Sequence, residues 1–259
     1  MTASLSLRTI LVAVFAFLYI PIAVLVALSF NEGGLPTVWS GFSLKWYASL
    51  ASNGEILSAA LNTLIVALVS TVLATLLGTL LAIGVEMRRH RGSALEALIF
   101  APMIIPDIVL AIALLSFFSM LDVIMGLHTI VLAHVVFNLA FVCSVVRARL
   151  KSFDWSITEA SADLGASALT TLRRVTVPVI LPAVIAGALL AFTLSVDEFI
   201  IAYFTAGAGR ASTTLPMQIY SMIRFGITPE INALATIVMA VSVTALTLSQ
   251  RLNRGMVGA

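Results

Sequence analysis

Six long apolar runs govern what this sequence can fold into. Each holds 20 residues or more, the length that a helix rising about 1.5 Å per residue needs to cross a hydrocarbon core about 30 Å thick. Hydrophobic residues make up 61% of the chain and charged residues 10%, which leaves too little charge to cover a water-soluble domain. We therefore expect an all-α, polytopic membrane protein with six transmembrane helices, at residues 9–30, 56–85, 97–121, 123–146, 175–196 and 231–250.

The positive charges between these runs predict the orientation in the membrane, because cytoplasmic loops carry the excess of Lys and Arg. With the N-terminus in the cytoplasm, three basic residues lie outside, namely Lys45, Arg210 and Arg224. Eleven then lie inside, namely Arg8, Arg88, Arg89, Arg91, Arg147, Arg149, Lys151, Arg173, Arg174, Arg251 and Arg254. We therefore expect both termini in the cytoplasm. The basic residues form short clusters and no continuous stripe, so we expect no nucleic acid partner.

The runs divide the chain into three parts. Residues 1–55 hold the first helix and a polar outer loop at 31–55, residues 56–250 form the core, and residues 251–259 form a short cytoplasmic tail. The first run is too long for the apolar region of a signal peptide, so we expect it to be retained. A basic turn is expected at 86–96 and a Gly-rich loop at 197–230.

Cysteine and histidine place limits on covalent and metal chemistry. Cys143 is the only cysteine, which excludes an intrachain disulfide. His128 and His134 are six residues apart and do not share a helix face, so we expect no metal site.

The cytoplasmic segment 147–178 carries the clearest local signals. Ser156 and Glu159 fit a capping box, which predicts a short helix over 157–164. Gly165 can end that helix in the left-handed conformation, and Ser167 can cap a second helix that runs through Leu172 towards the fifth span. These signals alone are equally consistent with a helical hairpin at the surface that only joins two spans.

The residues of this segment also match a known motif. Glu159-Ala160-Ser161, three residues, Gly165, nine residues and then Val175-Thr176-Val177-Pro178 resemble the EAA loop of binding-protein-dependent ABC importer permeases, in which EAA and G are followed by I-x-L-P. Ser161 replaces the second Ala, and Val175 and Val177 replace Ile and Leu. The resemblance implies the fold of a type I ABC importer permease.

In that family the EAA loop docks into a cleft of a cytoplasmic ATPase. By position, the resemblance implies that the coupling contact is formed by Glu159, Ala160, Ser161, Asp163, Leu164, Gly165 and Ala166. The Glu159 carboxylate could pair with a basic residue of the ATPase or could act only as a helix cap. The chain has no G-x-x-x-x-G-K-[ST] phosphate-binding loop, so we expect no cofactor in this chain, with ATP and magnesium bound by the partner.

Further segments, which together span most of the chain, resemble the second permease of spermidine/putrescine transport systems. Among them are Ile105-Pro106-Asp107-Ile108-Val109, Phe192-Thr193-Leu194-Ser195-Val196-Asp197-Glu198 and Leu215-Pro216-Met217-Gln218-Ile219-Tyr220-Ser221-Met222, together with further matches at 152–154, 162–167 and 228–236. The resemblance implies an ATP-driven importer of polyamines with a second related permease, two ATPase copies and a periplasmic or lipid-anchored binding protein. Relatives carry other small solutes, so a different substrate stays open.

Five residues are candidates for the substrate pathway. Asp107 lies ten residues into the third run, near the middle of the membrane, where a charge is costly and should face the bundle interior. Pro106 could instead break the helix, with Asp107 capping the restarted turn. Asp197 and Glu198 could bind an ammonium group or could simply end a helix at the interface. Tyr203 and Tyr220 could offer cation–π faces or belong to the interfacial aromatic belt.

Two other classes of membrane protein would need different sequence features. An ion-coupled secondary transporter of a small cationic solute would use Asp107 as its coupling site and would need no ATPase. An intramembrane enzyme is disfavoured, because the spans hold no HExxH helix and no convincing serine or aspartyl pair. We therefore expect a transport subunit that catalyses no reaction itself.

Overall fold

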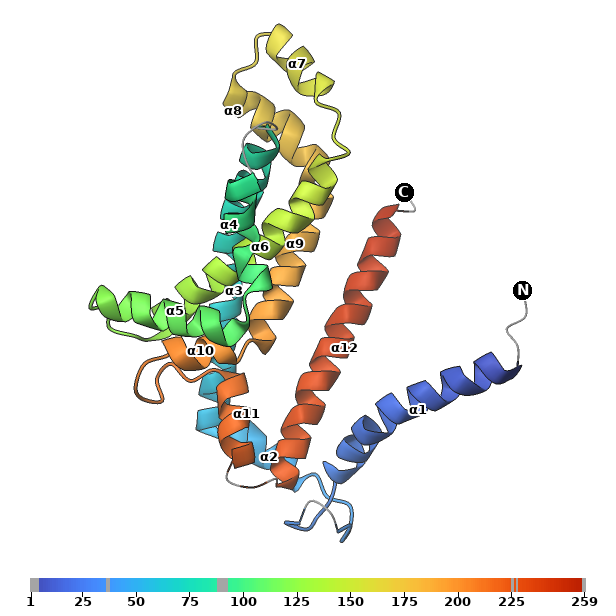
Figure 1. Cartoon of the computed structure of the whole chain (residues 1–259). Helices are drawn as coiled ribbons and strands as arrows, with labels where there is room; N and C mark the ends of the chain where they lie inside the picture. The colour runs from blue at the N-terminus through green and yellow to red at the C-terminus, as the bar shows by residue number, and fades with distance from the viewer. Residues whose placement is uncertain (1–4, 36–37, 88–92, 225, 227, 258–259) are drawn as a thin grey trace. The chain divides into compact units, whose positions relative to one another are not determined.

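The computed structural model describes residues 5–35, 38–87, 93–224, 226 and 228–257, and the arginines at 88, 89 and 91 of the expected basic turn lie outside them. The described residues form helices and a single isolated β-bridge between Asn31 and Phe42 (Figure 1). The helices are α1 (Leu5–Leu28), α2 (Lys45–Ser52), α3 (Gly54–Met87), α4 (Ser93–Ile104), α5 (Asp107–Met120), α6 (Leu127–Leu150), α7 (Ser156–Asp163), α8 (Ala168–Thr171), the π-helix η1 (Leu172–Thr176), α9 (Val177–Asp197), α10 (Ile200–Thr205), α11 (Leu215–Arg224) and α12 (Pro229–Val257).

The chain forms two compact units, one of residues Met1–Leu57 with Ile219–Ala259 and the other of Ser58–Gln218. In the first unit, α12 contacts both α1 and α2. The expectation of a plain loop at 31–55 is wrong, because this segment contains α2. Before α2, the buried Asn31 side chain donates to the Val38 carbonyl at 2.7 Å and accepts from the Ser40 amide at 2.9 Å. Ser49 Oγ donates to Glu230 Oε1 at 3.0 Å and links α2 to α12.

The second unit is built around α6, which packs along α9 and also contacts α4 and α10. Its buried side chains include Val142, Cys143 and Val146. A Cβ atom at Gly78 of α3 would lie 2.9 Å from the Val142 Cβ, so glycine is required where α3 crosses α6. This close approach confirms the packing role that glycine commonly has between transmembrane helices.

The third apolar run is not one straight helix. The expected span 97–121 is divided into α4 and α5, which are bent by 112° at the break. Pro106 explains the break, because it cannot donate a backbone hydrogen bond and it disfavours helical geometry in the residue before it. Beyond the break, α5 packs against α10, as Figure 1 shows at the lower left of the second unit.

The Gly-rich segment 197–230 also holds more structure than the sequence indicates, because it contains α10 and α11. Within the second unit, α3 organises the stretch between them. The Asn62 amide donates to the carbonyls of Ala211 and Thr213 at 3.0 and 2.9 Å, and Thr63 Oγ1 accepts from the Leu215 amide at 2.7 Å. Short helices of this kind depend on tertiary contacts for stability.

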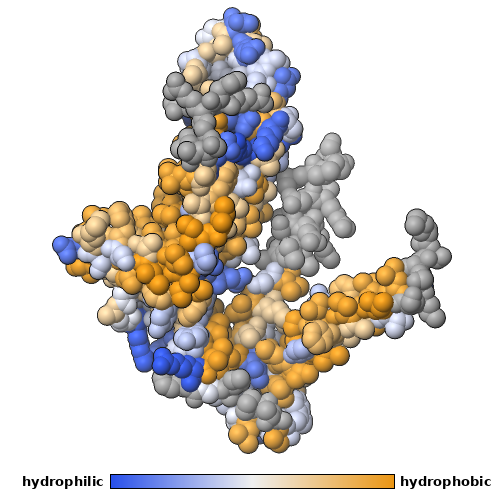
Figure 2. Space-filling model, viewed as in Figure 1, coloured by the Kyte–Doolittle hydropathy of each residue, from blue (hydrophilic) through white to orange (hydrophobic). Residues whose placement is uncertain are grey.

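The apolar helices fit a bilayer. Among the described residues, four helices are long and apolar enough to cross a membrane, the bent pair α4–α5 supplies up to one more, and α12 has an apolar stretch over Pro229–Thr244. Large apolar side chains such as Phe17 and Leu76 are more than half exposed. Figure 2 shows orange surface on these helices and a mainly blue and white surface around α7. The chain is therefore an all-α, multi-pass membrane protein.

Candidate functional site

The segment between α6 and α9 forms an elbow, which we define as residues 151–176. Its first helix, α7, starts at Ser156, with Trp155 as N-cap. The expected capping box of Ser156 and Glu159 is therefore wrong. Asp154 supplies the acceptor instead, because its Oδ1 accepts from the Ser156 amide at 3.0 Å. The Ser156 hydroxyl also bonds to this carboxylate. The bonds from the Ser156 hydroxyl and amide hold the pKa of Asp154 below its ordinary value.

The turn that ends α7 follows the prediction. Gly165 has a φ of 84°, in the left-handed region that favours glycine. The Gly165 amide donates to the Ala162 carbonyl at 2.8 Å and the Ala166 amide donates to the Ser161 carbonyl at 3.1 Å, which is the double bond pattern of a Schellman motif. Ser167 then caps α8 by accepting from the Thr170 amide, as expected.

The residues expected to form the coupling contact lie together on this elbow. Glu159, Ala160, Asp163, Leu164 and Gly165 are exposed. The Leu164 side chain is 90% exposed, although it is large and apolar. Ser161 and Ala166 are half-buried, and the Ser161 hydroxyl lies 2.9 Å from that of Thr171.

The second half of the elbow joins α9 through η1 rather than through a regular α-helix. Pro178 stands in the first turn of α9 and has no backbone N–H. In a continuous α-helix that N–H would bond to the carbonyl of Arg174, so the proline leaves that carbonyl without its regular partner. A π-helical turn at this place is consistent with strain next to a proline.

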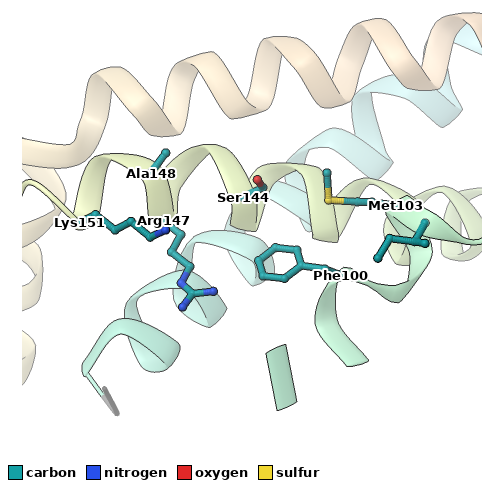
Figure 3. A pocket seen from close by; sticks show the side chains of 7 residues that line it. Phe100, Met103, Ser144, Arg147, Ala148 and Lys151 are labelled. Atoms are coloured by element: carbon teal, nitrogen blue, oxygen red, sulfur yellow. The ribbon is translucent and has the colours of Figure 1, made fainter. Parts of the chain in front are cut away.

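An ion-pair cluster lies where α6 enters the elbow. Arg147 bonds to Glu96 and lies 3.4 Å from Glu86 Oε2, which joins α6 to α4 and α3. Its guanidinium also lies 5.8 Å from the centre of the Phe100 ring. Arg147 and Phe100 also line a cavity of about 480 Å³. Figure 3 shows the side chains around it, which are Phe100, Met103, Ile104, Ser144, Arg147, Ala148 and Lys151. Sequence reasoning counted Arg147 only as a positive charge and missed this cluster, although Glu86 and Glu96 flank the basic turn.

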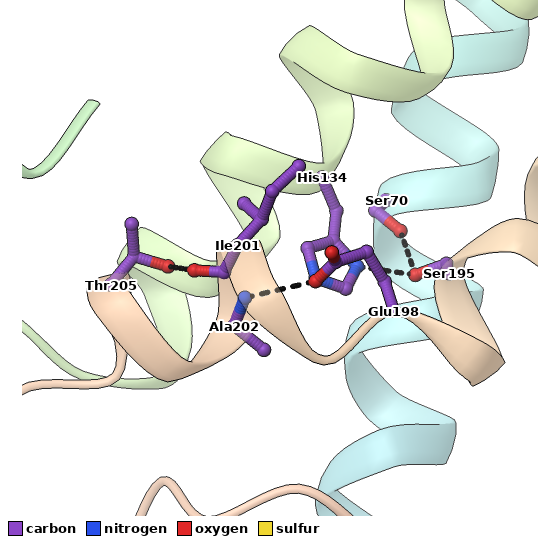
Figure 4. Close-up of polar contacts among 7 residues, drawn as sticks. All are labelled: Ser70, His134, Ser195, Glu198, Ile201, Ala202 and Thr205. Atoms are coloured by element: carbon purple, nitrogen blue, oxygen red, sulfur yellow. Dashed lines mark hydrogen bonds and ion pairs between the residues drawn. The ribbon is translucent and has the colours of Figure 1, made fainter. Parts of the chain in front are cut away.

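A second polar cluster lies inside the second unit, at the end of α9 remote from the elbow (Figure 4). His134 Nδ1 lies 2.6 Å from Ser195 Oγ, which lies 3.0 Å from Ser70 Oγ. On its other side, His134 Nε2 lies 3.8 Å from Glu198 Oε2, and that oxygen accepts from the Ala202 amide at 3.0 Å. The Glu198 side chain is 7% exposed and that of His134 is 1% exposed. Glu198 therefore belongs to a buried polar network and does not lie at a solvated helix end.

Two of the predicted pathway residues lie on neighbouring elements. Asp107 is exposed at the start of α5, and Glu198 lies just before α10, the helix that packs against α5. Pro106 is the N-cap of α5, and among the described residues Asp107 makes no hydrogen bond that would cap the helix. The break at Pro106 is thus confirmed, but the capping bond expected from Asp107 is absent.

The other three pathway candidates, Asp197, Tyr203 and Tyr220, are exposed. Asp197 is the last residue of α9 and is exposed. Tyr203 lies on α10, 49% exposed, with its ring 5.4 Å from that of Phe199. Tyr220 lies on α11 in the other unit and is also about half exposed.

Comparison with known proteins decides the family. The family model described as "Binding-protein-dependent transport system inner membrane component" matches residues 74–256. The chain belongs to this family of transport permeases. It is 40% identical over 242 residues to the spermidine/putrescine transport system permease protein PotC of Haemophilus influenzae, over 93% of each chain. It is 43% identical over 238 residues to the putrescine transport system permease protein PotI of Escherichia coli, over 89% of this chain and 84% of the relative.

A solved structure supports the fold. A chain from the crystal structure of a bacterial ABC transporter involved in the import of the acidic polysaccharide alginate superposes with a TM-score of 0.77 at 15% identity, over 97% of this chain and 99% of that one. The expected fold of an ABC importer permease is thereby confirmed.

A permease of this family is a transport component and not an enzyme. Ser195, His134 and Glu198 are residue types that hydrolases use for catalysis. Their burial in this chain does not suit that role. The Ser195 side chain is 2% exposed, and its hydroxyl lies within hydrogen-bonding distance of both Ser70 and His134. A substrate carbonyl therefore cannot approach that oxygen.

Proposed function

We propose that this chain forms half of the translocation pathway of an ATP-driven, binding-protein-dependent importer of polyamines. The observation that carries the substrate class is the placement of the Asp107 and Glu198 carboxylates at the start of α5 and just before α10, two helices that pack against each other. Two neighbouring carboxylates attract a cation with more than one positive charge. The printed names of the two relatives, which specify spermidine and putrescine, point to the same class of substrate.

The orientation follows from the distribution of basic residues, with both termini and the elbow in the cytoplasm. In this arrangement the polar surface around α7 faces water, and the core at 56–250 spans the membrane. The residues at 1–55 then contribute the first span and an outer segment, and residues 251–259 form a cytoplasmic tail.

The elbow couples the permease to a cytoplasmic ATPase, which binds the ATP and magnesium. A short helix that presents one exposed apolar side chain, Leu164, and small residues such as Ala160 and Gly165 can enter a groove on a partner. Asp163 and Glu159 then border the contact, with Ala166 at its base, and Ser161 supports α7 from inside the elbow. Movement of the ATPase would displace the elbow as a rigid body and carry α6 and α9 with it.

The assembly implied for such a permease contains a second related permease, two ATPase copies and a periplasmic or lipid-anchored binding protein. In the pathway, Asp107, Asp197 and Glu198 attract the ammonium groups, and Tyr203 and Tyr220 supply aromatic faces for cation–π contacts. The ion-coupled alternative is not favoured, because the family depends on binding proteins. An importer for a different small solute is the alternative that the experiment must test.

The test is the ATPase activity of the purified assembly in lipid, with a binding protein that is empty or loaded with putrescine or spermidine. We expect stimulation by the polyamine-loaded protein only. The variant Leu164→Asp should abolish it, because it places a charge in the apolar contact, while Leu169→Asp on the neighbouring helix α8 should keep it. Stimulation by another ligand alone would overturn the polyamine assignment, and an assembly without ATPase would overturn the importer class.

A further inference from the structure

The buried cluster around His134 joins four helices. Ser70 belongs to α3, His134 to α6, Ser195 to α9, and Glu198 precedes α10, whose Ala202 amide donates to the carboxylate. The Ser70 side chain is fully buried and those of Ser195 and His134 are 2% and 1% exposed. Two of these helices, α6 and α9, are the ones that flank the elbow. The contact between His134 and Ser195 therefore joins the two helices that lead to the elbow, and His134 also faces the Glu198 carboxylate.

The contacts of Glu198 indicate which nitrogen of His134 carries the hydrogen. Glu198 Oε2 accepts from the Ala202 amide at the start of α10, so this oxygen acts as an acceptor. His134 Nε2 is buried, has no hydrogen-bond partner among the described residues and faces the same oxygen at 3.8 Å. A bare nitrogen lone pair would repel a carboxylate oxygen, whereas an N–H would be attracted to it. Nε2 therefore carries the hydrogen.

The remaining bonds follow from that assignment. In a neutral imidazole with its hydrogen on Nε2, Nδ1 is an acceptor, so the Ser195 hydroxyl donates to it over 2.6 Å. The Ser195 oxygen is then free to accept from the Ser70 hydroxyl over 3.0 Å, and the Ser70 hydroxyl shares its hydrogen with the Ala67 carbonyl at 3.3 Å. A doubly protonated imidazole is disfavoured at this site, because burying an additional charge is costly.

We propose that His134 is a positioning residue for Glu198. A chain of hydrogen bonds directed from Ser70 to Ser195 to His134 aims the Nε2 hydrogen at the carboxylate and sets its orientation. The part of this proposal that involves a polyamine rests on the function proposed above. An arriving ammonium competes with Nε2–H for Oε2, and the contact between α6 and α9 then responds to occupancy of the pathway.

Two substitutions separate positioning of Glu198 from simple packing of α6 against α9. His134→Gln places an amide nitrogen near the position of Nε2 and can still donate towards Glu198. His134→Asn places its polar atoms near the position of Nδ1, so it can still bond to Ser195 but cannot reach Glu198. His128→Gln is the control, because His128 is exposed on the same helix.

The first measurement is uptake by the assembled transporter in liposomes at saturating loaded binding protein, together with ATP hydrolysis. We expect His134→Asn to lower uptake per ATP about tenfold, the effect of losing a contact to a charged group. His134→Gln and His128→Gln should remain near wild type. The concentration of binding protein that gives half-maximal ATPase activity should not change, whereas general structural damage would alter it. In the Glu198→Gln background, His134→Asn should have no further effect.

The second measurement is nitrogen-15 NMR of labelled histidine in the unmodified assembly, with His134→Gln used to assign the signals. A protonated Nε2 and a bare Nδ1 are expected. A bare Nε2, protonation of both nitrogens, or equal activity of His134→Asn and wild type when Glu198→Gln is impaired would overturn the proposal. If Nε2 is protonated and Glu198→Gln transports polyamine normally, the positioning of Glu198 is supported and its role in the proposed pathway is overturned.

Discussion

The hydroxyl oxygens of Ser161 and Thr171 lie 2.9 Å apart and join the two halves of the elbow. Ser161 belongs to α7 and Thr171 ends α8, so this bond spans the turn at Gly165. In the EAA motif that the sequence resembles, Ala stands at the position of Ser161. Here the serine hydroxyl turns inward, where it stabilises the angle between the two helices.

Removal of either hydroxyl should therefore loosen the elbow slightly and in the same way. We expect Ser161→Ala and Thr171→Val each to destabilise it by about 1 kcal/mol, the net value of one hydrogen bond. The double variant should be no worse than either single one, because both remove the same bond. Thermal unfolding of the assembly and ATP-coupled uptake would measure this. Additive losses would show that the two hydroxyl groups act independently.

The left-handed backbone at Gly165 predicts a graded series of substitutions. A Cβ atom there would meet no heavy atom within 4 Å, so any effect arises from the backbone conformation and not from a clash. Gly165→Asn should be tolerated, Gly165→Ala should cost about 1–2 kcal/mol, and Gly165→Pro should abolish the turn, because proline fixes φ near −65°. Co-purification of the ATPase with the permease would rank the variants. Equal retention by all three would contradict a role for this conformation.

Asp154 predicts a pH dependence at the start of α7. Its pKa is lowered from 3.8 in the folded protein by the hydrogen bonds from Ser156. The ionised form is therefore favoured by folding, so its contribution is complete above the ordinary pKa and is lost as the pH falls through the lower, folded value. Fluorescence of the adjacent Trp155, in a Trp39→Phe/Trp46→Phe background, should change between about pH 5 and pH 2. The change should be absent in Asp154→Asn, and its persistence there would assign it to another group.

The sequence predicts features that depend on local chemistry and misses those that depend on packing. The apolar runs located α1, α3, α6 and α9, and the signals at Gly165 and Ser167 located the elbow turn and its second cap. The role of Asp154 was missed because the sequence offers two acceptors for the first amides of α7, the Ser156 hydroxyl and the Asp154 carboxylate. The carboxylate accepts from the Ser156 amide. The proline at 106 predicts a break, but the 112° bend also reflects the packing of α5 on α10.

The buried cluster shows a stronger limit. Ser195 and His134 are separated by 61 residues, and Ser195 and Ser70 by 125. Each is an isolated polar residue within an apolar run, where no spacing rule connects it to the others. Only the packing of α3, α6 and α9 brings them together. The sequence left open whether Glu198 binds an ammonium group or ends a helix at the interface, and it did not indicate the buried network to which Glu198 belongs.

The Arg147 cluster predicts which ion pair contributes most to stability where α6 enters the elbow. Glu86 is 7% exposed, whereas Glu96 is 45% exposed. Arg147→Ala leaves the buried Glu86 without this partner and should destabilise the assembly by about 3 kcal/mol. Glu96→Gln should have a much smaller effect, since an exposed pair is screened by solvent. Thermal unfolding in lipid would test this order, with the exposed Arg149→Ala on the same helix as control. A larger loss in the control would contradict it.

Asp107 predicts a salt-dependent effect on transport. Its carboxylate is exposed at the start of α5, so in the proposed pathway it raises the local concentration of cations. Asp107→Asn should lower polyamine uptake about tenfold at low ionic strength, and the deficit should shrink as salt screens the charge. Asp122→Asn is the matched control, because Asp122 is exposed just beyond the other end of α5 and its φ of 53° is one that asparagine also adopts. If both variants lower uptake equally and independently of salt, the effect belongs to the overall charge of the permease, and Asp107 has no special place on the pathway.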